Sequence, residues 1–150
     1  MEGGVERPGT RKPIKGFRDL EVFQRSLGLL KPVHDLVLAF PEHERFDLAN
    51  QMRRASKSIP TNIAEGYARR HSAKVFRQHL EVALGSANEM EAHFEVACAL
   101  GYVTGEQRDH FVEEFAIVAR QLRRLIANWR TIPPLYPPPS TLHPPEENGQ

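Results

Sequence analysis

The chain has very little cysteine and no long apolar run. Among its 150 residues there is a single cysteine, Cys98, so a disulfide within the chain is excluded. The longest apolar stretches are far shorter than the 18 or so residues of a membrane-spanning helix, and residues 1–16 contain no apolar segment of the kind that a secretory signal needs. We therefore expect a reduced, cytoplasmic setting and no membrane partner.

The sequence also lacks the motifs that carry common catalytic and metal chemistry. No Walker loop, Gly-x-Gly-x-x-Gly, Gly-x-Ser-x-Gly, His-Glu-x-x-His or Cys-x-x-Cys is present. None of the seven histidines follows a glutamate by three residues, so the Glu-x-x-His pairs of di-iron bundles are missing. Glu89 with His93 has the i, i+4 spacing, which we interpret as a surface pair rather than half of a metal site. We expect no enzyme activity, no metal and no cofactor.

What the sequence does contain is the 3.6-residue apolar periodicity of amphipathic helices. Four such segments lie near residues 19–40, 46–70, 72–100 and 104–130. With 40% hydrophobic and 26% charged residues, the composition is ordinary for one globular domain. The sequence therefore predicts an all-α, antiparallel up-down-up-down four-helix bundle over residues 17–130.

Individual residues refine the expected helices. Those placed to cap or end a helix are Asp47, Ser72, Gly101 and the capping-box pair Thr104 and Gln107. Pro32 lacks a backbone N–H and crowds the preceding turn, so we expect a break or kink between Leu29 and Pro32. Around Pro60 the apolar stripe stays in phase, which predicts a kink rather than an end. Leu27 is expected in the core. Gly85, in the middle of a helix, is expected to allow close approach of a neighbouring helix.

The two ends of the chain differ from the middle. Residues 1–16 contain glycine, proline and an excess of basic residues, which predicts a disordered basic arm; a plain flexible terminus and an arm that contacts nucleic acid both fit it. Residues 131–150 contain seven prolines, which predicts a disordered or polyproline II tail.

A row of polar residues runs beside the apolar stripe of the second predicted helix. Its members recur at spacings of three and four, and they are Gln51, Arg54, Ser58, Asn62, Glu65 and Arg69. A helix on the outside of a bundle needs an apolar stripe, but it does not need an ordered polar row beside that stripe. We interpret the row as a polar interface, within one bundle or between subunits, with a ligand pocket as a third alternative.

The net charge of +1 conceals a strong segregation of charge along the chain. Residues 53–79 contain seven Lys or Arg and one acid, whereas residues 81–114 contain eight acids and one Arg. Antiparallel helices would gather the basic segments at one pole and the acidic segments at the other. A phosphate-binding surface, an assembly surface and plain solvation all fit this pattern. The candidate nucleic-acid contacts are Arg53, Lys57, Arg69, Arg70, Lys74, Arg77, Arg123 and Arg124.

Residues 51–66 have the sequence QMRRASKSIPTNIAEG, which resembles the signature of a known family. The similarity continues upstream in FRDLEVFQRS and downstream in VALGSANEMEAHFEVACALGY, and it covers roughly residues 17–130. The family consists of bacterial four-helix-bundle proteins encoded in intervening sequences of large-subunit ribosomal RNA genes. The accessory proteins of diversity-generating retroelements are related to it. Pro32 departs from the family pattern.

The resemblance implies a homo-oligomeric ring or barrel, with a pentamer favoured by the retroelement relatives. Those relatives resemble basic platforms that engage nucleic acid and a reverse transcriptase. The matching positions expected to determine fold and assembly are Arg54, Ser58, Asn62, Glu65, Gly66, Gly85, Ser86 and Glu89.

The residues and the resemblance together favour a non-enzymatic, oligomeric accessory protein that binds RNA or DNA through a basic pole. No aromatic-rich platform is visible, so base stacking is not expected. A reverse transcriptase is a candidate partner. The alternative, from a different class, is a homo-oligomeric scaffold that binds only protein.

Overall fold

The computed structural model describes residues 13–129, which form five α-helices and two short 3-10 helices and contain no strand. The helices are η1 (Phe17–Asp19), α1 (Glu21–Gly28), α2 (Leu30–Val37), η2 (Glu42–Glu44), α3 (Leu48–Ala68), α4 (Ala73–Ala99) and α5 (Gly105–Asn128). The expectations for residues 1–12 and 130–150 lie outside the described residues. Residues 13–16, assigned to the arm from the sequence, are described, and Ile14 packs against the core.

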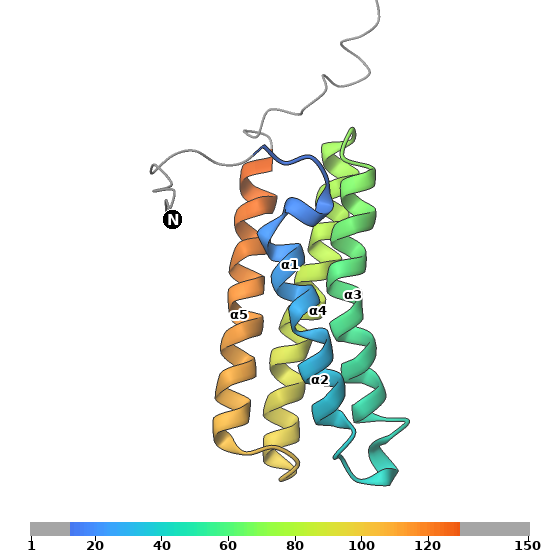
Figure 1. Ribbon diagram of the computed structural model, residues 1–150, viewed down its shortest axis with the longest axis vertical. Helices are drawn as coiled ribbons and strands as arrows, with labels where there is room; N and C mark the ends of the chain where they lie inside the picture. Colours follow the sequence, from blue (N-terminus) through green and yellow to red (C-terminus); the bar gives the residue numbers. More distant parts are fainter. Residues whose placement is uncertain (1–12, 130–150) are drawn as a thin grey trace, which may run out of the picture.

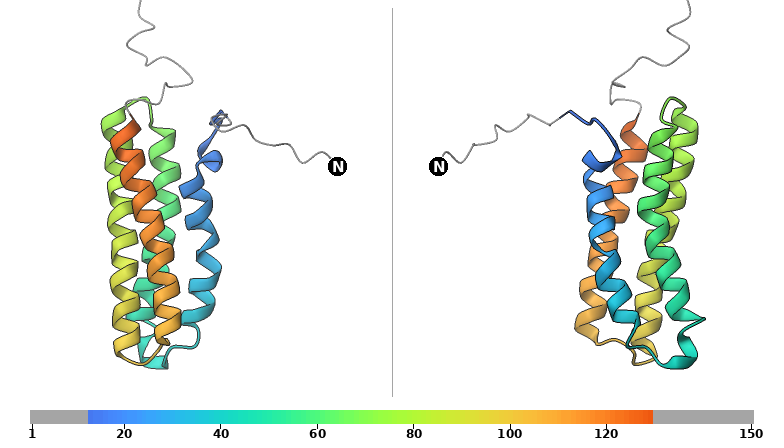
Figure 2. Two further views of the ribbon diagram at one scale, coloured as in Figure 1. Left: turned by 90° about the vertical axis from the view of Figure 1, so that its left-hand side faces the viewer. Right: turned by 45° about the vertical axis from the view of Figure 1, so that its right-hand side comes forward.

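The helices form the predicted four-helix bundle. α1 and α2 follow one another along one side, and α3, α4 and α5 supply the other three sides (Figure 1). α3 packs against α4, α4 packs against α5, and α1 contacts both α3 and α5, which closes the arrangement (Figure 2). The all-α fold and its up-down topology are therefore confirmed.

The core is built from the stripes that the sequence predicts for α3, α4 and α5. Met52, Ile59 and Ile63 of α3 are fully buried, as are Phe76 and Phe94 of α4. The Phe94 ring stacks on that of Phe111, with centroids 4.7 Å apart and planes 7° apart. Offset aromatic pairs of this kind add to the stabilisation that their buried area provides.

The break predicted near Pro32 occurs at Leu29, which separates α1 from α2. Pro32 has no N–H to donate to the carbonyl of Gly28, four residues earlier. The Leu29 N–H instead reaches the Ser26 carbonyl at 3.3 Å, and the Val33 N–H bonds to the Leu29 carbonyl at 3.2 Å. A new run of helical backbone hydrogen bonds therefore begins at the Leu29 carbonyl.

The expectation that Leu27 faces the core is wrong, because its side chain is 49% exposed. Ser26 occupies the core position and is 1% exposed. Its hydroxyl donates to the Phe23 carbonyl at 3.0 Å, which satisfies the polar group inside the bundle. The buried stripe therefore runs through a serine and not through the neighbouring leucine.

Three of the four predicted helix signals are confirmed in their geometry. The Ser72 hydroxyl accepts from the Val75 N–H at 3.2 Å, Thr104 and Gln107 form a reciprocal capping box, and Gly101 ends α4 with φ +79°. Asp47 does occupy the N-cap position of α3, but its side chain makes no capping bond there. Its backbone at φ −119°, ψ −108° lies outside the usual extended cap geometry, and Oδ1 accepts from Gln51 Nε2 at 3.1 Å.

α3 continues through Pro60, as predicted. Side-chain donors supplement the backbone ladder nearby: Thr61 Oγ1 donates to the Lys57 carbonyl at 2.9 Å, and Asn62 Nδ2 donates to the Ser58 carbonyl at 2.8 Å. None of the helices formed by residues 13–129 has the length and apolar content that a bilayer crossing requires.

Candidate nucleic-acid interface

The topology brings the basic segments together at one end of the bundle. The end of α3, the start of α4 and the end of α5 all lie at the top in Figure 1, where the described chain also begins. We call this end the basic pole, and its residues are Arg69, Arg70, Lys74, Arg77, Arg123 and Arg124. We call the other end, with η2 and the connection from α4 to α5, the acidic pole. The predicted gathering of basic segments therefore follows from the observed helix order.

At the α3–α4 turn, one cation of the basic pole is held in place and another is weakly paired. The Arg70 guanidinium lies over the Tyr67 ring, 4.3 Å from its centroid, and its Nη1 donates to the Tyr67 carbonyl at 3.1 Å. Arg69 lies 3.9 Å from Glu65, but both side chains are more than half exposed, so this pair contributes little. Arg70 is therefore pre-oriented without a counter-charge among residues 13–129.

Other cations of the basic pole have no partner within the described part of the chain. Lys74, Arg77 and Arg124 make no hydrogen bond or ion pair with any residue from 13 to 129, and Lys74 and Arg124 are exposed. Positive groups in this state are available to an outside anion.

Arg123, like Arg69, has an acidic neighbour. Burial raises the pKa of Glu91 on α4, while the charges of Arg123 and Arg120 lower it and Glu113 raises it further. The burial of the Glu91 carboxyl raises its pKa more than the attraction to Arg123 and Arg120 lowers it. Glu91 is therefore a weak partner for Arg123. Arg123 remains an exposed cation on the last turns of α5.

The structure does not bring Arg53 and Lys57 to the basic pole. Both lie in the first half of α3, toward the acidic pole. Arg53 Nη2 donates to the Arg45 carbonyl at 2.8 Å, so this side chain anchors the connection before α3. Lys57 is exposed and has no partner among residues 13–129.

The polar row of α3 divides into an inner network and an outer set. In the inner network, Ser58 Oγ accepts from Asn62 Nδ2 and from Ser86 Oγ, each at 3.0 Å. His79 Nδ1 lies 3.2 Å from Asn62 Oδ1, which extends the network along α4. These four residues join α3 to α4 within one chain.

The outer members of the row make short-range contacts or none. Gln51 bonds to Asp47 one turn earlier, Glu65 pairs with Arg69, and on α4 Glu89 lies 3.0 Å from His93. Arg54 is exposed and makes no hydrogen bond or ion pair with any residue that the structure describes. Arg54 is therefore the member of the row that is open to a second molecule.

The two glycines assigned to assembly have opposite surroundings. A methyl group on Gly66 would lie 2.6 Å from His79 Cβ and 3.0 Å from Phe76 Cδ2, so Gly66 is what allows α3 and α4 to approach here. The expectation for Gly85 is wrong within one chain. Gly85 is exposed, and a methyl group there would meet no described atom within 4 Å.

Sequence reasoning missed His79 as a partner of Asn62. The available signal was its position seven residues before Ser86, on the same face of α4. It also missed the link across the acidic pole, where the Tyr102 hydroxyl lies 3.2 Å from His43 Nε2. Burial and the adjacent Glu44 carboxylate raise the pKa of Tyr102.

Residues 13–129 contain no group of three or more His, Cys, Asp or Glu side chains that could hold a metal ion.

Comparisons with known proteins agree on the fold and the lineage. The family model described as 23S rRNA-intervening sequence protein matches residues 18–124. A crystal structure of a protein of unknown function, from the S23 ribosomal protein family of Bacteroides thetaiotaomicron, superimposes with a TM-score of 0.64 at 26% identity. The match covers 71% of this chain and 95% of that one. A search of curated proteins gave no match.

Proposed function

Because the chain belongs to the 23S rRNA-intervening sequence protein family, we propose that it is a non-enzymatic, homo-oligomeric accessory protein that binds RNA or DNA. The observation that carries the proposal is the set of cations at the basic pole. They come from the ends of three helices, and Lys74, Arg77 and Arg124 have no counter-charge among residues 13–129. A reverse transcriptase is the protein partner suggested by the resemblance, and a pentamer is the suggested assembly.

Phosphates are the part of a nucleic acid that this surface suits. The aromatic side chains near it, Tyr67 and Trp129, are 5% and 8% exposed and belong to the core. Tyr67 and Trp129 therefore offer bases no stacking platform, and the contacts that the described cations would make are with backbone phosphates. Binding of this kind is insensitive to base sequence and falls steeply with salt.

Self-assembly is supported by the outer face of α3 and α4. Arg54 has no partner among residues 13–129, Gly85 has no other described atom within 4 Å of the place of a Cβ, and Val82 is 53% exposed on the same helix as Gly85. A second copy packed on this face would cover the apolar side chain and supply a partner for Arg54. Assembly would also present several basic poles to one nucleic acid, which raises the overall affinity.

The test is fluorescence anisotropy of labelled RNA and DNA, single-stranded and duplex, titrated with protein at several salt concentrations. For the unchanged protein we expect a log–log salt slope of roughly −3 or steeper, which corresponds to about three neutralised phosphates. The double variant Lys74→Glu/Arg124→Glu should reduce the magnitude of that slope by about 2.

The matched control is Lys31→Glu/Lys57→Glu, which changes the net charge equally at exposed positions away from the basic pole. It should leave the slope nearly unchanged. Equal weakening by both variants would mean that net charge alone attracts the nucleic acid. An assembled oligomer that binds no nucleic acid at low salt would overturn the proposal. The open face around Arg54 would then favour the second candidate, a scaffold that assembles and binds only protein.

A further inference from the structure

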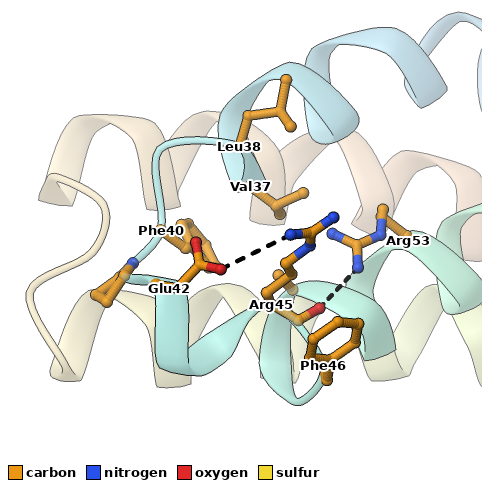
Figure 3. A pocket seen from close by; sticks show the side chains of 9 residues that line it. Val37, Leu38, Phe40, Glu42, Arg45, Phe46 and Arg53 are labelled. Atoms are coloured by element: carbon orange, nitrogen blue, oxygen red, sulfur yellow. Dashed lines mark hydrogen bonds and ion pairs between the residues drawn. The ribbon is translucent and has the colours of Figure 1, made fainter.

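The connection between α2 and α3 forms a hollow at the acidic pole that is lined by both apolar and charged side chains. It has a volume of about 540 Å³, and Figure 3 shows the side chains that line it. Two large apolar side chains beside it are open to water, with Leu38 79% and Phe46 83% exposed. We call this surface the α2–α3 corner. Removing a phenylalanine side chain from water is favourable, so an occupant would be stabilised by covering Phe46.

The α2–α3 corner has a cationic rim in the otherwise acidic half of the bundle. The Arg45 guanidinium lies over the Phe46 ring, 5.3 Å from its centroid, and Nη1 is 3.7 Å from Glu42 (Figure 3). Both members of that ion pair are well exposed, so it is weak. Arg53 uses Nη2 to hold the Arg45 carbonyl. Two guanidinium groups therefore face one carboxylate, which leaves a positive charge in excess.

An aromatic ring beside a proline and arginines is a surface that suits a proline-rich segment followed by acidic groups. Extended proline-rich segments bind to aromatic-lined grooves at a small entropic cost, because their conformation is already restricted. Pro41 and Phe46 line the hollow, and Arg45 and Arg53 lie at its rim. The ligand chemistry is thus an apolar, proline-containing stretch that ends in carboxylates.

One segment of the chain itself has this chemistry. Residues 142–147 read LHPPEE, with Leu142, two prolines and then Glu146 and Glu147. We propose that this segment binds in the α2–α3 corner of its own chain, with the leucine and prolines against Phe46 and the glutamates toward Arg45 and Arg53.

The length of chain between α5 and this segment agrees with the distance to be covered. α5 has 24 residues, so it is about 36 Å long, and it ends at the pole opposite the α2–α3 corner. Trp129 is still helical and buried, so the reach is counted from it. At about 3.1 Å per residue in polyproline II, residue 142 could reach roughly 40 Å from Trp129. Leu135 and Tyr136, the other apolar pair of the tail, could reach only about 19–22 Å. The reach therefore selects residues 142–147 over the nearer segment.

The experiment places the photo-crosslinker p-benzoylphenylalanine in place of Leu142 in the full chain, with Leu135 replaced as the matched control. No Lys or Arg follows Arg130, so trypsin releases the whole tail as one peptide, and it releases residues 46–53 as another. We expect the crosslinker at position 142, and not at 135, to join these two peptides. Mixing copies labelled with ¹⁴N and ¹⁵N distinguishes a crosslink within one chain from a crosslink between chains.

Substitutions on both sides of the contact complete the test. Phe46→Ser and Glu146→Gln/Glu147→Gln, which add no tryptic site, should each lower the yield of this crosslink by about tenfold, equivalent to roughly 1.4 kcal/mol. Phe46 is almost fully exposed, so its substitution should leave the circular dichroism spectrum and the melting temperature unchanged. A crosslink from position 142 that lies elsewhere, joins two copies, or keeps its yield in both variants would overturn the proposal.

Discussion

The two poles of the bundle differ in whether their cationic side chains have acidic partners. At the acidic pole, Arg108 bonds to Asp109 at 3.0 Å and lies 3.8 Å from Glu95, and the two carboxylates raise its pKa further. The Tyr102 hydroxyl connects to His43 across the two loops of that pole. At the basic pole, Lys74 and Arg124 have no such partners among residues 13–129.

The difference is that Arg108 has carboxylate neighbours, whereas Lys74 and Arg124 have none among residues 13–129. Like charges held together without counter-charges lower stability, because they repel one another. The basic pole is therefore not explained by what it contributes to folding. An external anion is the partner that would remove the repulsion, and the contrast between the poles thus supports the proposed phosphate contacts.

The largest expected effect comes from Gly66→Ala, near the basic pole. The added methyl group meets His79 Cβ at 2.6 Å, so α3 and α4 must move apart, at a cost of about 1–3 kcal/mol in the free energy of unfolding. Gly85→Ala is the matched control; it meets open space and should raise that free energy by about 0.5–1 kcal/mol. Urea denaturation of both variants measures the two changes. Equal stability of the two would contradict the close approach at Gly66.

The next effect compares the N-caps of the two poles. Thr104→Ala/Gln107→Ala removes both bonds of the capping box at the acidic pole, because the box uses the Thr104 hydroxyl and the Gln107 side chain, and should lower the free energy of unfolding by about 1 kcal/mol. Ser72→Ala at the basic pole removes a single bond, the one from the Val75 N–H, and should cost less. Thermal melts of the two variants rank them. The reverse ranking would mean that the box adds nothing to the simple cap.

A smaller effect separates binding from stability. Ser72→Asp keeps a good N-cap, so stability should stay within about 0.5 kcal/mol, while the new negative charge at the basic pole should weaken nucleic-acid binding roughly two- to fivefold. Thr104→Asp makes the same kind of change at the acidic pole and should leave the affinity unchanged. Anisotropy titrations at one salt concentration measure both. An equal loss of affinity in the two variants would mean that nucleic acid does not bind preferentially at the basic pole.

The smallest effect concerns Glu91, where the acidic part of α4 meets the arginines of α5. Its pKa is raised from 4.5, mainly by burial, so the unfolded chain releases this proton at a lower pH than the folded one. The free energy of unfolding therefore falls as the pH rises from about 4.5 through the raised pKa, and the full penalty remains above it. Glu91→Gln should raise the melting temperature slightly at pH 7 and leave it unchanged at pH 4. A lower melting temperature at pH 7 would show that the attraction to Arg123 exceeds the burial penalty.

The sequence was sufficient where one residue determines local geometry. The caps at Ser72 and Thr104, the stop at Gly101 and the restart before Pro32 follow from backbone chemistry that neighbours in the chain decide. The gathering of basic groups at one end was predictable as well, because it needs only the order and direction of the helices.

What the sequence did not predict depends on contacts between elements. Ser26 and not Leu27 is buried against the other helices, and apolar periodicity cannot identify a serine as a core residue. Gly66 and Gly85 are both glycines within helices, and the sequence does not distinguish them. They differ in the atoms near the place of a Cβ, which are close at Gly66 and absent within 4 Å among the described residues at Gly85. Arg53 was grouped with the cations by type, yet it holds the Arg45 carbonyl.

The interruption at Leu29 has a consequence for the order of folding. α1 and α2 have eight residues each, which is too short for either to be stable as an isolated helix. α3, α4 and α5 are joined by tight connections and pack in sequence, so their contacts are local and fast to form. α1 and α2 are thus expected to dock last, on a surface that the other three helices have already formed. They are also expected to detach first when the bundle opens.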